Sequence, residues 1–208
     1  MTPRKAFILV LSVGLLWAIA DQWTKYLAVR DLTHLFSEES GLIERVRLFY
    51  STHDLRRIAK PPIEIIPGFW NHIYVQNPAG AFGLLSGLAD GPRRLFFTVV
   101  ALLASAGILY FSTKNYGKGM LPSQLCFALV FGGAVGNLMD RVVHGYVIDF
   151  IDWHVTIRGT THHWPAFNLA DVGIVVGVFG ILLLFNFGPE PAREGEDKAS
   201  REEQAEAG

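Results

Sequence analysis

Four long apolar runs, each almost free of formal charge, constrain this chain of 208 residues more than any other feature of its sequence. A helix that crosses the hydrocarbon layer of roughly 30 Å needs about 20 residues at about 1.5 Å per residue, so the first and last runs must extend into polar neighbours. The sequence therefore predicts an all-α membrane protein with four transmembrane helices. The predicted spans cover residues 6–27, 95–111, 121–139 and 169–187.

The start of the chain imitates a secretory signal peptide, because two basic residues precede an apolar stretch that ends in small residues. We expect this stretch to be retained as the first span, since Asp21 and Lys25 continue its helix as a same-face pair one turn apart. An even number of spans places both termini on one side of the membrane. Cations in the short segments on that side predict that it is the cytoplasm. They are Arg4, Lys5, Lys114 and Lys118.

The long segment at 28–94 is predicted to be extracytoplasmic, and its residue composition changes along its length. Residues 31–60 mix charged and apolar positions at roughly helical spacing, which indicates an inserted surface or interfacial helix pair near the site. The stretches 63–66 and 69–76 are short, aromatic and β-branched, with turn residues between them. They indicate a small extramembrane β-sheet.

The charge balance excludes nucleic acid as a partner, because 18 basic and 19 acidic residues give a net charge of −1 without a basic cluster. The single cysteine, Cys126, supports neither a disulfide within the chain nor a Cys-rich metal site, and is interpreted as a lipid-facing or packing side chain. The acidic residues at 189–208 are typical of a disordered tail, which would follow the membrane domain at 1–188 on the cytoplasmic side.

Polar residues inside the spans are costly, and here they all fall at helix ends that face the extracytoplasmic side. Such a set requires a shared water-accessible pocket or mutual pairing. We expect Asp140 to form a structural ion pair with Arg141 or Lys25. Asp149, in an extended segment, and Asp171 then lack an obvious local cation. The full set in the spans is Asp21, Lys25, Asn137, Asp140, Arg141, Asn168 and Asp171.

Two carboxylates without a cation at a wet membrane surface suggest acid–base hydrolysis. Close like charges cannot both ionise, so the pair would share a proton and supply a base for water and an acid for a peptide carbonyl oxygen. The sequence contains no G-x-S-x-G, no HExxH and no cysteine near an interfacial histidine. His154, His162 and His163 gather in the outer loop, with His144 nearby, but they lack ligand-spacing motifs. We therefore expect no metal site and no cofactor.

Five motifs in the chain resemble those of the lipoprotein signal peptidases (signal peptidase II), which are membrane aspartyl peptidases of bacteria. They occur in the family's order and cover nearly the whole chain outside the 31–60 insertion and the tail. In the second motif the glycine stands one position later than in the family's usual Asn-x-Gly-Ala-Ala. The motifs are 21–25 (DQWTK), 77–82 (NPAGAF), 132–141 (GGAVGNLMDR), 147–150 (VIDF) and 167–171 (FNLAD).

By this resemblance, Asp149 and Asp171 form the catalytic dyad, and Asp140 matches the family's non-dyad aspartate. The resemblance implies a prolipoprotein substrate, held in membrane lipid, whose lipobox cysteine carries diacylglyceryl. The peptide would be cut on the N-terminal side of that cysteine, at the outer leaflet of the bacterial inner membrane. The residues implied to bind or position substrate are Asn77, Gly80, Asn137, Arg141, Asn168, Asp21 and Lys25.

Two other interpretations compete with an active peptidase. A small transporter or assembly factor could use the outer charges as an ion or partner site, but a proton-coupled transporter normally places carboxylates near the bilayer midplane and shows repeat symmetry. A peptidase relative without activity is the second alternative. In each case a monomer is expected, because a four-helix bundle can bury its own polar face.

Overall fold

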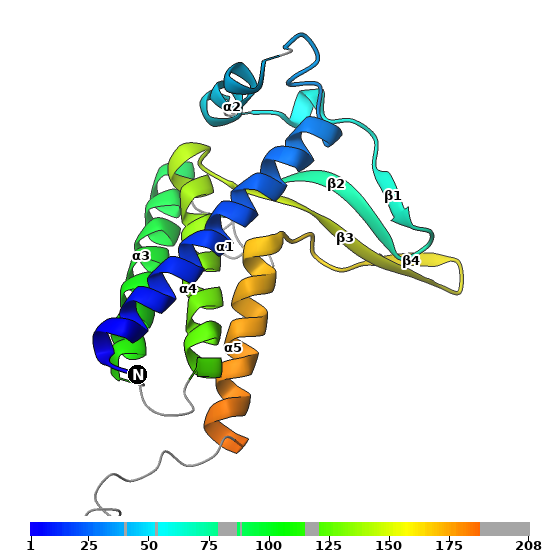
Figure 1. The fold of residues 1–208 in the computed structure, drawn as a ribbon. Helices are drawn as coiled ribbons and strands as arrows, with labels where there is room; N and C mark the ends of the chain where they lie inside the picture. Colours follow the sequence, from blue (N-terminus) through cyan, green and yellow to red (C-terminus); the bar gives the residue numbers. More distant parts are fainter. Residues whose placement is uncertain (40, 53, 79–86, 88, 115–120, 188–208) are drawn as a thin grey trace, which may run out of the picture.

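The computed structural model describes residues 1–39, 41–52, 54–78, 87, 89–114 and 121–187. Among them, four helices are long and apolar enough to cross a membrane, and Figure 1 shows them side by side beneath a small sheet. Their bounds are α1 Pro3–Leu32, α3 Asp90–Lys114, α4 Leu121–Val143 and α5 Leu169–Phe187. The predicted fold class is confirmed. Gly80 and the predicted tail lie outside the described residues.

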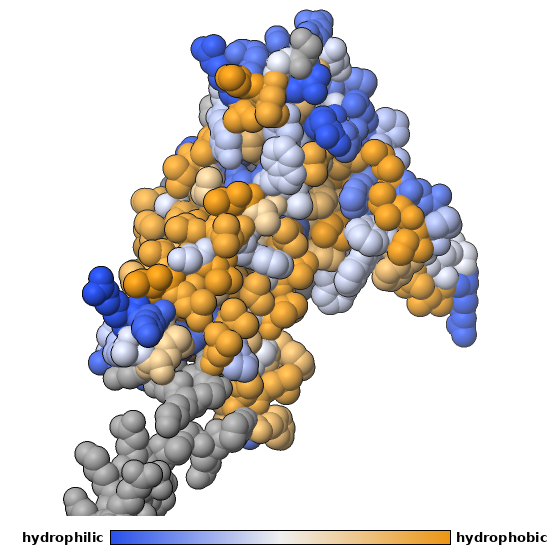
Figure 2. All heavy atoms as spheres, in the orientation of Figure 1, coloured by the Kyte–Doolittle hydropathy of each residue, from blue (hydrophilic) through white to orange (hydrophobic). Residues whose placement is uncertain are grey.

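Apolar side chains cover the outside of the helical part of the molecule. Leu16, Leu103 and Val175 are each about two-thirds exposed, as lipid-facing residues are. In Figure 2 hydrophobic residues form a broad band over the helices, whereas hydrophilic residues gather at the N-terminal end and on the outer segment beyond the band. This distribution fits a multi-pass membrane protein, because lipid tails replace the core as the apolar environment.

The first helix is longer than a bilayer requires. Its 30 residues extend about 45 Å at about 1.5 Å per residue, against about 30 Å of hydrocarbon. The predicted span ended at residue 27, but the helix continues to Leu32 before extended backbone at Thr33 ends it. Its last turns reach the outer segment (Figure 1).

Helix α4 lies at the centre of the bundle, and its glycines allow neighbouring backbones to approach closely. A Cβ atom at Gly132 would lie 2.5 Å from the Gly14 carbonyl oxygen of α1, and one at Gly133 would overlap the Ala170 carbonyl oxygen of α5. Small residues at such crossings are the usual means of packing membrane helices, because water does not drive their association. The close approach brings the polar outer ends of α1, α4 and α5 together.

The sheet has four antiparallel strands in the order β1-β2-β3-β4. They are β1 Ile63–Ile66, β2 Trp70–Asn77, β3 Val147–Ile157 and β4 Thr160–His163. The first two strands fall where the sequence placed them. The sequence analysis did not predict β4, which follows β3 after a two-residue turn with φ of 52° at Arg158 and 81° at Gly159. Positive φ at both central residues matches the right-handed twist of the paired strands.

The predicted helix pair at 31–60 is correct only in its first member. Leu42–Ser51 forms helix α2, but the second helix is replaced by a single 3-10 turn at Arg56–Ile58. Lys60 stands directly before Pro61, and a residue before proline avoids helical backbone, which disfavours a helix that continues to residue 60. The backbone here instead bonds to the end of α1.

The 31–60 segment covers one end of the sheet without adding a strand to it. Phe36 and Phe49 of this segment pack in one cluster with Tyr26 of α1 and with Tyr146 and Ile148 at the start of β3. Burial of these side chains holds the segment over the junction of helix and sheet.

Candidate active site

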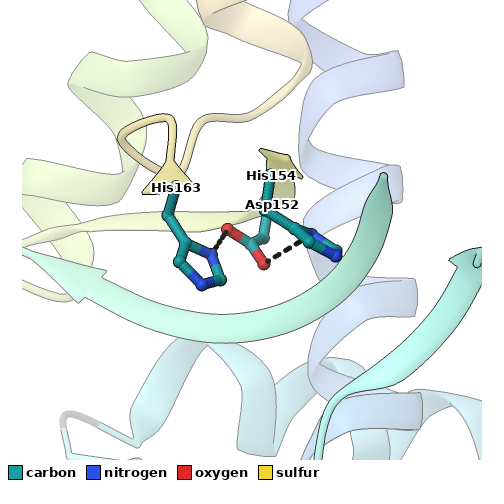
Figure 3. A group of neighbouring side chains, drawn as sticks. All are labelled: Asp152, His154 and His163. Atoms are coloured by element: carbon teal, nitrogen blue, oxygen red, sulfur yellow. Dashed lines mark hydrogen bonds and ion pairs between the residues drawn. The ribbon is translucent and has the colours of Figure 1, made fainter. Parts of the chain in front are cut away.

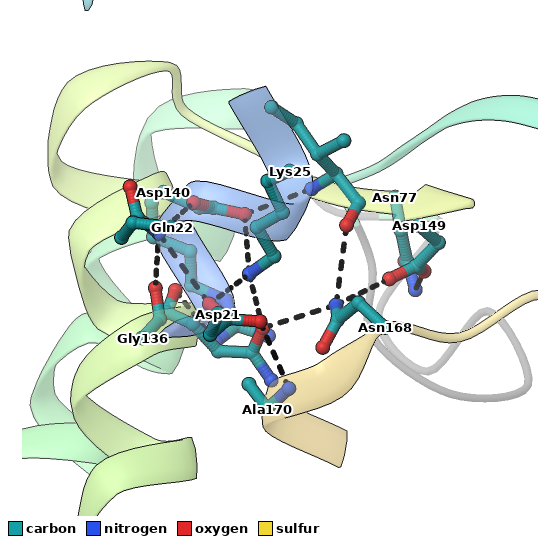
Figure 4. A network of polar contacts seen from close by, with 12 residues as sticks. Asp21, Gln22, Lys25, Asn77, Gly136, Asp140, Asp149, Asn168 and Ala170 are labelled. Carbon is teal, nitrogen blue, oxygen red and sulfur yellow. Dashed lines mark hydrogen bonds and ion pairs between the residues drawn. The ribbon is translucent and has the colours of Figure 1, made fainter. Parts of the chain in front are cut away.

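The predicted polar residues meet where the outer ends of α1 and α4 approach the start of β3 and the start of α5. Figure 4 shows part of this set in one network of hydrogen bonds and ion pairs; the predicted residues labelled there are Asp21, Lys25, Asn77, Asp140, Asp149 and Asn168. Most of them are buried: Lys25, Asp140 and Asn168 have no exposed surface, and Asp149 is 1% exposed. Residues from four separate segments therefore form one site.

A buried ion triad lies at the base of this site. Lys25 Nζ is 2.8 Å from both Asp21 Oδ2 and Asp140 Oδ2, and 3.1 Å from Asn137 Oδ1. These three contacts use all three donors of the ammonium group. Of the two cations that the sequence offered to Asp140, the structure selects Lys25 and not Arg141.

Each carboxylate of the triad also holds a backbone N–H group that directly precedes one of the candidate catalytic aspartates. Asp140 Oδ2 accepts a 2.9 Å hydrogen bond from the backbone of Ile148, next to Asp149. Asp21 Oδ1 accepts a 2.8 Å bond from the backbone of Ala170, next to Asp171. The triad thus positions β3 and the start of α5 relative to the helices, which is a positioning role rather than contact with substrate.

Asp149 lies on β3 with both carboxylate oxygens bonded to asparagine amides. Its Oδ2 accepts from Asn77 Nδ2 at 2.8 Å, and its Oδ1 accepts from Asn168 Nδ2 at 2.7 Å. Burial, followed by the nearby charge of Asp171, raises the pKa of Asp149 to about 7, although the two amide bonds and Lys25 act against this rise. Asp149 can therefore hold a proton near neutral pH.

Asp171 lies in the first turn of α5 and forms a reciprocal cap with Asn168. The Asn168 side-chain oxygen accepts from the Asp171 backbone N–H at 3.0 Å, and Asp171 Oδ2 accepts from the Asn168 backbone N–H at 3.2 Å. This arrangement is a capping box, which satisfies N–H groups that the first turn of a helix leaves free. The helix N-terminus also favours a negative charge at Asp171.

Two asparagines connect the aspartates to each other and to the triad. Asn137 donates to Asp171 Oδ1 at 2.8 Å, and its own oxygen accepts from Asn168 Nδ2 at 3.2 Å. Because Asn168 also donates to Asp149, a continuous chain of hydrogen bonds joins the two carboxylates. Ile151 and Phe167 exchange backbone bonds of 2.9 and 3.1 Å beside this chain, which pairs β3 with the segment entering α5.

Arg141 lies at the edge of the site. Its guanidinium group donates to the Asn137 carbonyl oxygen at 3.3 Å and stands 5.1 Å from the centre of the Phe97 ring. Within the described residues, no ion pair joins it to Asp149 or Asp171. It can therefore meet a further polar group that enters the site.

Sequence reasoning missed Gln22 and the two backbone donors. Gln22 Nε2 bonds to Asp140 Oδ1 at 2.7 Å, and Tyr50 of α2 donates to Gln22 Oε1 at 3.4 Å. A glutamine beside Asp21 in an otherwise apolar helix is a sequence signal for membership of the polar site. The backbone N–H groups of Ile148 and Ala170 carry no such signal, because every residue except proline has one.

The chain as a whole resembles known enzymes in sequence and in fold. The sequence profile of the family described as Signal peptidase (SPase) II matches residues 13–187. The lipoprotein signal peptidase of Anaeromyxobacter sp. (strain Fw109-5) is 41% identical over 203 residues, covering 95% of each chain. The lipoprotein signal peptidase of Alteromonas mediterranea is 35% identical over 193 residues, covering 92% of this chain and 88% of the relative.

A solved structure of a bacterial membrane enzyme superposes with a TM-score of 0.57 at 28% identity, covering 89% of this chain and 93% of that one. The profile match spans most of the chain. The chain therefore belongs to the signal peptidase II family, the lipoprotein signal peptidases, which remove signal peptides from prolipoproteins.

Proposed function

We propose that Asp149 and Asp171 are the catalytic pair of an aspartic endopeptidase that processes lipidated prolipoproteins. The observation that carries this proposal is the hydrogen-bonded chain that joins the two carboxylates through Asn137 and Asn168. No ion pair neutralises either carboxylate within the described part of the chain. The charge of Asp171 raises the pKa of Asp149, so the two carboxylates interact and one of them can hold a proton near neutral pH, as acid–base catalysis by two carboxyl groups requires.

The surroundings of the two carboxyl groups suggest which one acts as the acid and which one as the base. Asp149 holds the proton and donates a hydrogen bond to the scissile carbonyl oxygen, because its pKa is raised to about 7. Asp171, at the N-terminus of α5, acts as the ionised base that removes a proton from water. The water oxygen bonds to the carbonyl carbon, the C–N bond then breaks, and the leaving amine takes up a proton from the pair.

The position of the site fits a substrate that is anchored in lipid. The aspartates lie where the helices meet the extramembrane sheet, so the acyl chains of a diacylglyceryl cysteine can stay in the bilayer while the peptide reaches the site. We propose cleavage on the N-terminal side of that cysteine, at the outer leaflet of the inner membrane. In this arrangement both termini are cytoplasmic, and one chain supplies the complete site.

A gel-shift assay with two substrates tests the proposal. Purified full-length protein in detergent is incubated with a diacylglyceryl-modified prolipoprotein and, separately, with its unmodified precursor. We expect loss of the signal peptide from the lipidated form alone, because the lipid holds the peptide at the depth of the aspartates. Equal cleavage of both forms would refute the lipid requirement, and no cleavage by folded protein would favour a relative without activity.

The pH profile of cleavage tests the shared proton. Above the pKa of about 7 at Asp149, the pair loses its proton and with it the acid, so kcat/KM, which follows the pKa values of the free enzyme, should fall about tenfold for each pH unit. The measurement is kcat/KM on the lipidated substrate from pH 5 to 9, with thermal unfolding recorded at each pH to show that the protein stays folded. A rate that stays constant to pH 9 would contradict the assigned acid.

A further inference from the structure

The outer half of β3 and its hairpin partner β4 hold a second cluster of titratable side chains, separate from the aspartate pair. Asp152 and His154 lie on β3 and His163 lies on β4. Figure 3 shows the two imidazole rings on either side of the Asp152 carboxylate. The possible ligand atoms of the three residues all lie within 4.8 Å of one another.

The strand geometry explains why these three side chains meet. Residues two apart on a strand share a face, which places Asp152 beside His154. The register pairs His154 directly with His163 across the hairpin, and the two rings stack with centroids 5.3 Å apart. His162 pairs with Val155 instead, and alternation turns it to the opposite face of β4. Three ligands thus converge on one face from two strands.

One nitrogen of the cluster lacks a hydrogen-bond partner although it is buried. The His154 side chain is 10% exposed, and its Nδ1 has no hydrogen bond. The nearest acceptor is Asp152 Oδ2 at 3.6 Å, which is too far for a hydrogen bond. An unsatisfied buried polar atom costs about 1 to 3 kcal/mol, and a bound cation would supply the missing partner.

The surroundings of Asp152 also favour a bound cation. This carboxylate is 5% exposed, and its contacts are His163 Nδ1 at 2.7 Å and Asn71 Nδ2 at 3.4 Å. No lysine or arginine pairs with it among the described residues. A buried carboxylate between two imidazoles offers one carboxylate oxygen and two imidazole nitrogens as ligand atoms. This is the ligand chemistry that zinc and related divalent transition metals prefer.

We propose that Asp152, His154 and His163 bind a divalent transition-metal ion of the zinc class. Two nitrogens and one carboxylate oxygen leave a fourth tetrahedral position for water or a ligand. Calcium and magnesium are disfavoured, because they take six or more oxygen ligands or keep an octahedral water shell. Tetrahedral bonds of about 2.0 to 2.1 Å require ligand atoms about 3.3 Å apart, so small side-chain shifts suffice.

The ion would join β4 to β3, the strand that also carries Asp149. We therefore expect the bound ion to stabilise the β3–β4 hairpin. The proposed metal site does not depend on the catalytic roles proposed for Asp149 and Asp171. The sequence alone predicts no metal site here, because the three ligands follow no short-range spacing. They are brought together by the β3–β4 hairpin, whose second strand has no clear signal in the sequence.

Metal binding by the full-length, tag-free protein in detergent tests the proposal. The protein is stripped with chelator and titrated with Zn²⁺ in a calorimeter, and Co²⁺ is added to a second sample for visible absorption. We expect one ion per chain, a Co²⁺ spectrum typical of four-coordinate ligands, and a higher unfolding temperature with Zn²⁺. His163→Ala should weaken binding by on the order of 10- to 100-fold or more. Its unfolding temperature without metal, compared with that of the unchanged protein, shows whether the variant folds.

His162→Ala is the matched control, since it removes a neighbouring exposed histidine from the opposite face of the same strand. It should bind Zn²⁺ as the unchanged protein does. Equal losses in His162→Ala and His163→Ala would identify surface histidine binding and overturn the site. Absence of a stoichiometric ion in the unchanged protein would overturn it as well.

Discussion

Asp149→Asn is expected to reduce cleavage of the lipidated substrate to background while the protein remains folded and extractable. Loss of a general acid or base typically lowers the rate by on the order of 100-fold to 10,000-fold. Asparagine keeps the shape of the side chain but cannot hold the shared proton. The measurement is kcat by gel shift, with the thermal unfolding temperature of each variant in the same detergent.

Of the two substitutions in the proposed dyad, Asp149→Asn should disturb the local hydrogen bonds less than Asp171→Asn. The asparagine introduced at position 149 has an N–H group where Asp149 has an oxygen. Asn77, its neighbour, is only partly buried and can turn its own amide, so that its oxygen accepts a hydrogen bond from this group. At Asp171 one of the two donors is the backbone N–H of Asn168, which cannot turn. Asp171→Asn should therefore also abolish cleavage, but with some loss of stability.

An exposed carboxylate provides the control for this experiment. Asp31 pairs with Arg30 on the outer end of α1, and both side chains are nearly half exposed. Asp31→Asn should leave kcat within about twofold, since surface pairs contribute little. Cleavage by folded Asp149→Asn at more than a tenth of the normal rate would contradict its role as the acid.

Lys25→Met is expected to destabilise the protein more than any change at its surface. The ammonium group has no exposed surface and contacts Asp21 and Asp140 at 2.8 Å each. Removing one partner of a buried ion pair costs about 3 to 5 kcal/mol, because the remaining charge stays buried and unpaired. Here two carboxylates would remain, so we expect a fall on the order of 10 °C in unfolding temperature and a low yield.

Arg30→Gln tests whether burial of the ion pair is the cause of the large loss of stability expected for Lys25→Met. It breaks an ion pair of similar length, 2.7 Å, on the same helix but in solvent, and should cost at most about 1 kcal/mol. Asp140→Asn should be intermediate, because Lys25 keeps Asp21 as a partner. A Lys25→Met protein with normal yield and unchanged unfolding temperature would show that the triad does not hold the bundle together.

The same triad links stability to catalysis, because its carboxylates hold the backbone beside both dyad aspartates. Partial activity in a Lys25 variant that still folds would therefore reflect displaced aspartates and not lost chemistry. Because the charge of Lys25 lowers the pKa of Asp149, the same variant should also keep its activity to a higher pH than the unchanged protein does.

The amino-acid sequence by itself determined the four helices, the first two strands and the side of the membrane region on which the polar residues gather. The physical reason is that apolar length and residue spacing along one helix or strand are local properties. Asp21 and Lys25 share a face because they are one helical turn apart, whatever surrounds them. By their resemblance to the family, the five motifs also predicted the aspartate pair.

Only the tertiary structure decided which groups meet across segments. It selected Lys25 over Arg141 as the partner of Asp140, and it used the backbone of Ile148 and Ala170 as donors. It also brought His163 beside Asp152 by a hairpin that closes through positive φ at two residues. Such contacts depend on helix crossing and strand register, which arise from packing between segments and leave no periodic signal in the chain.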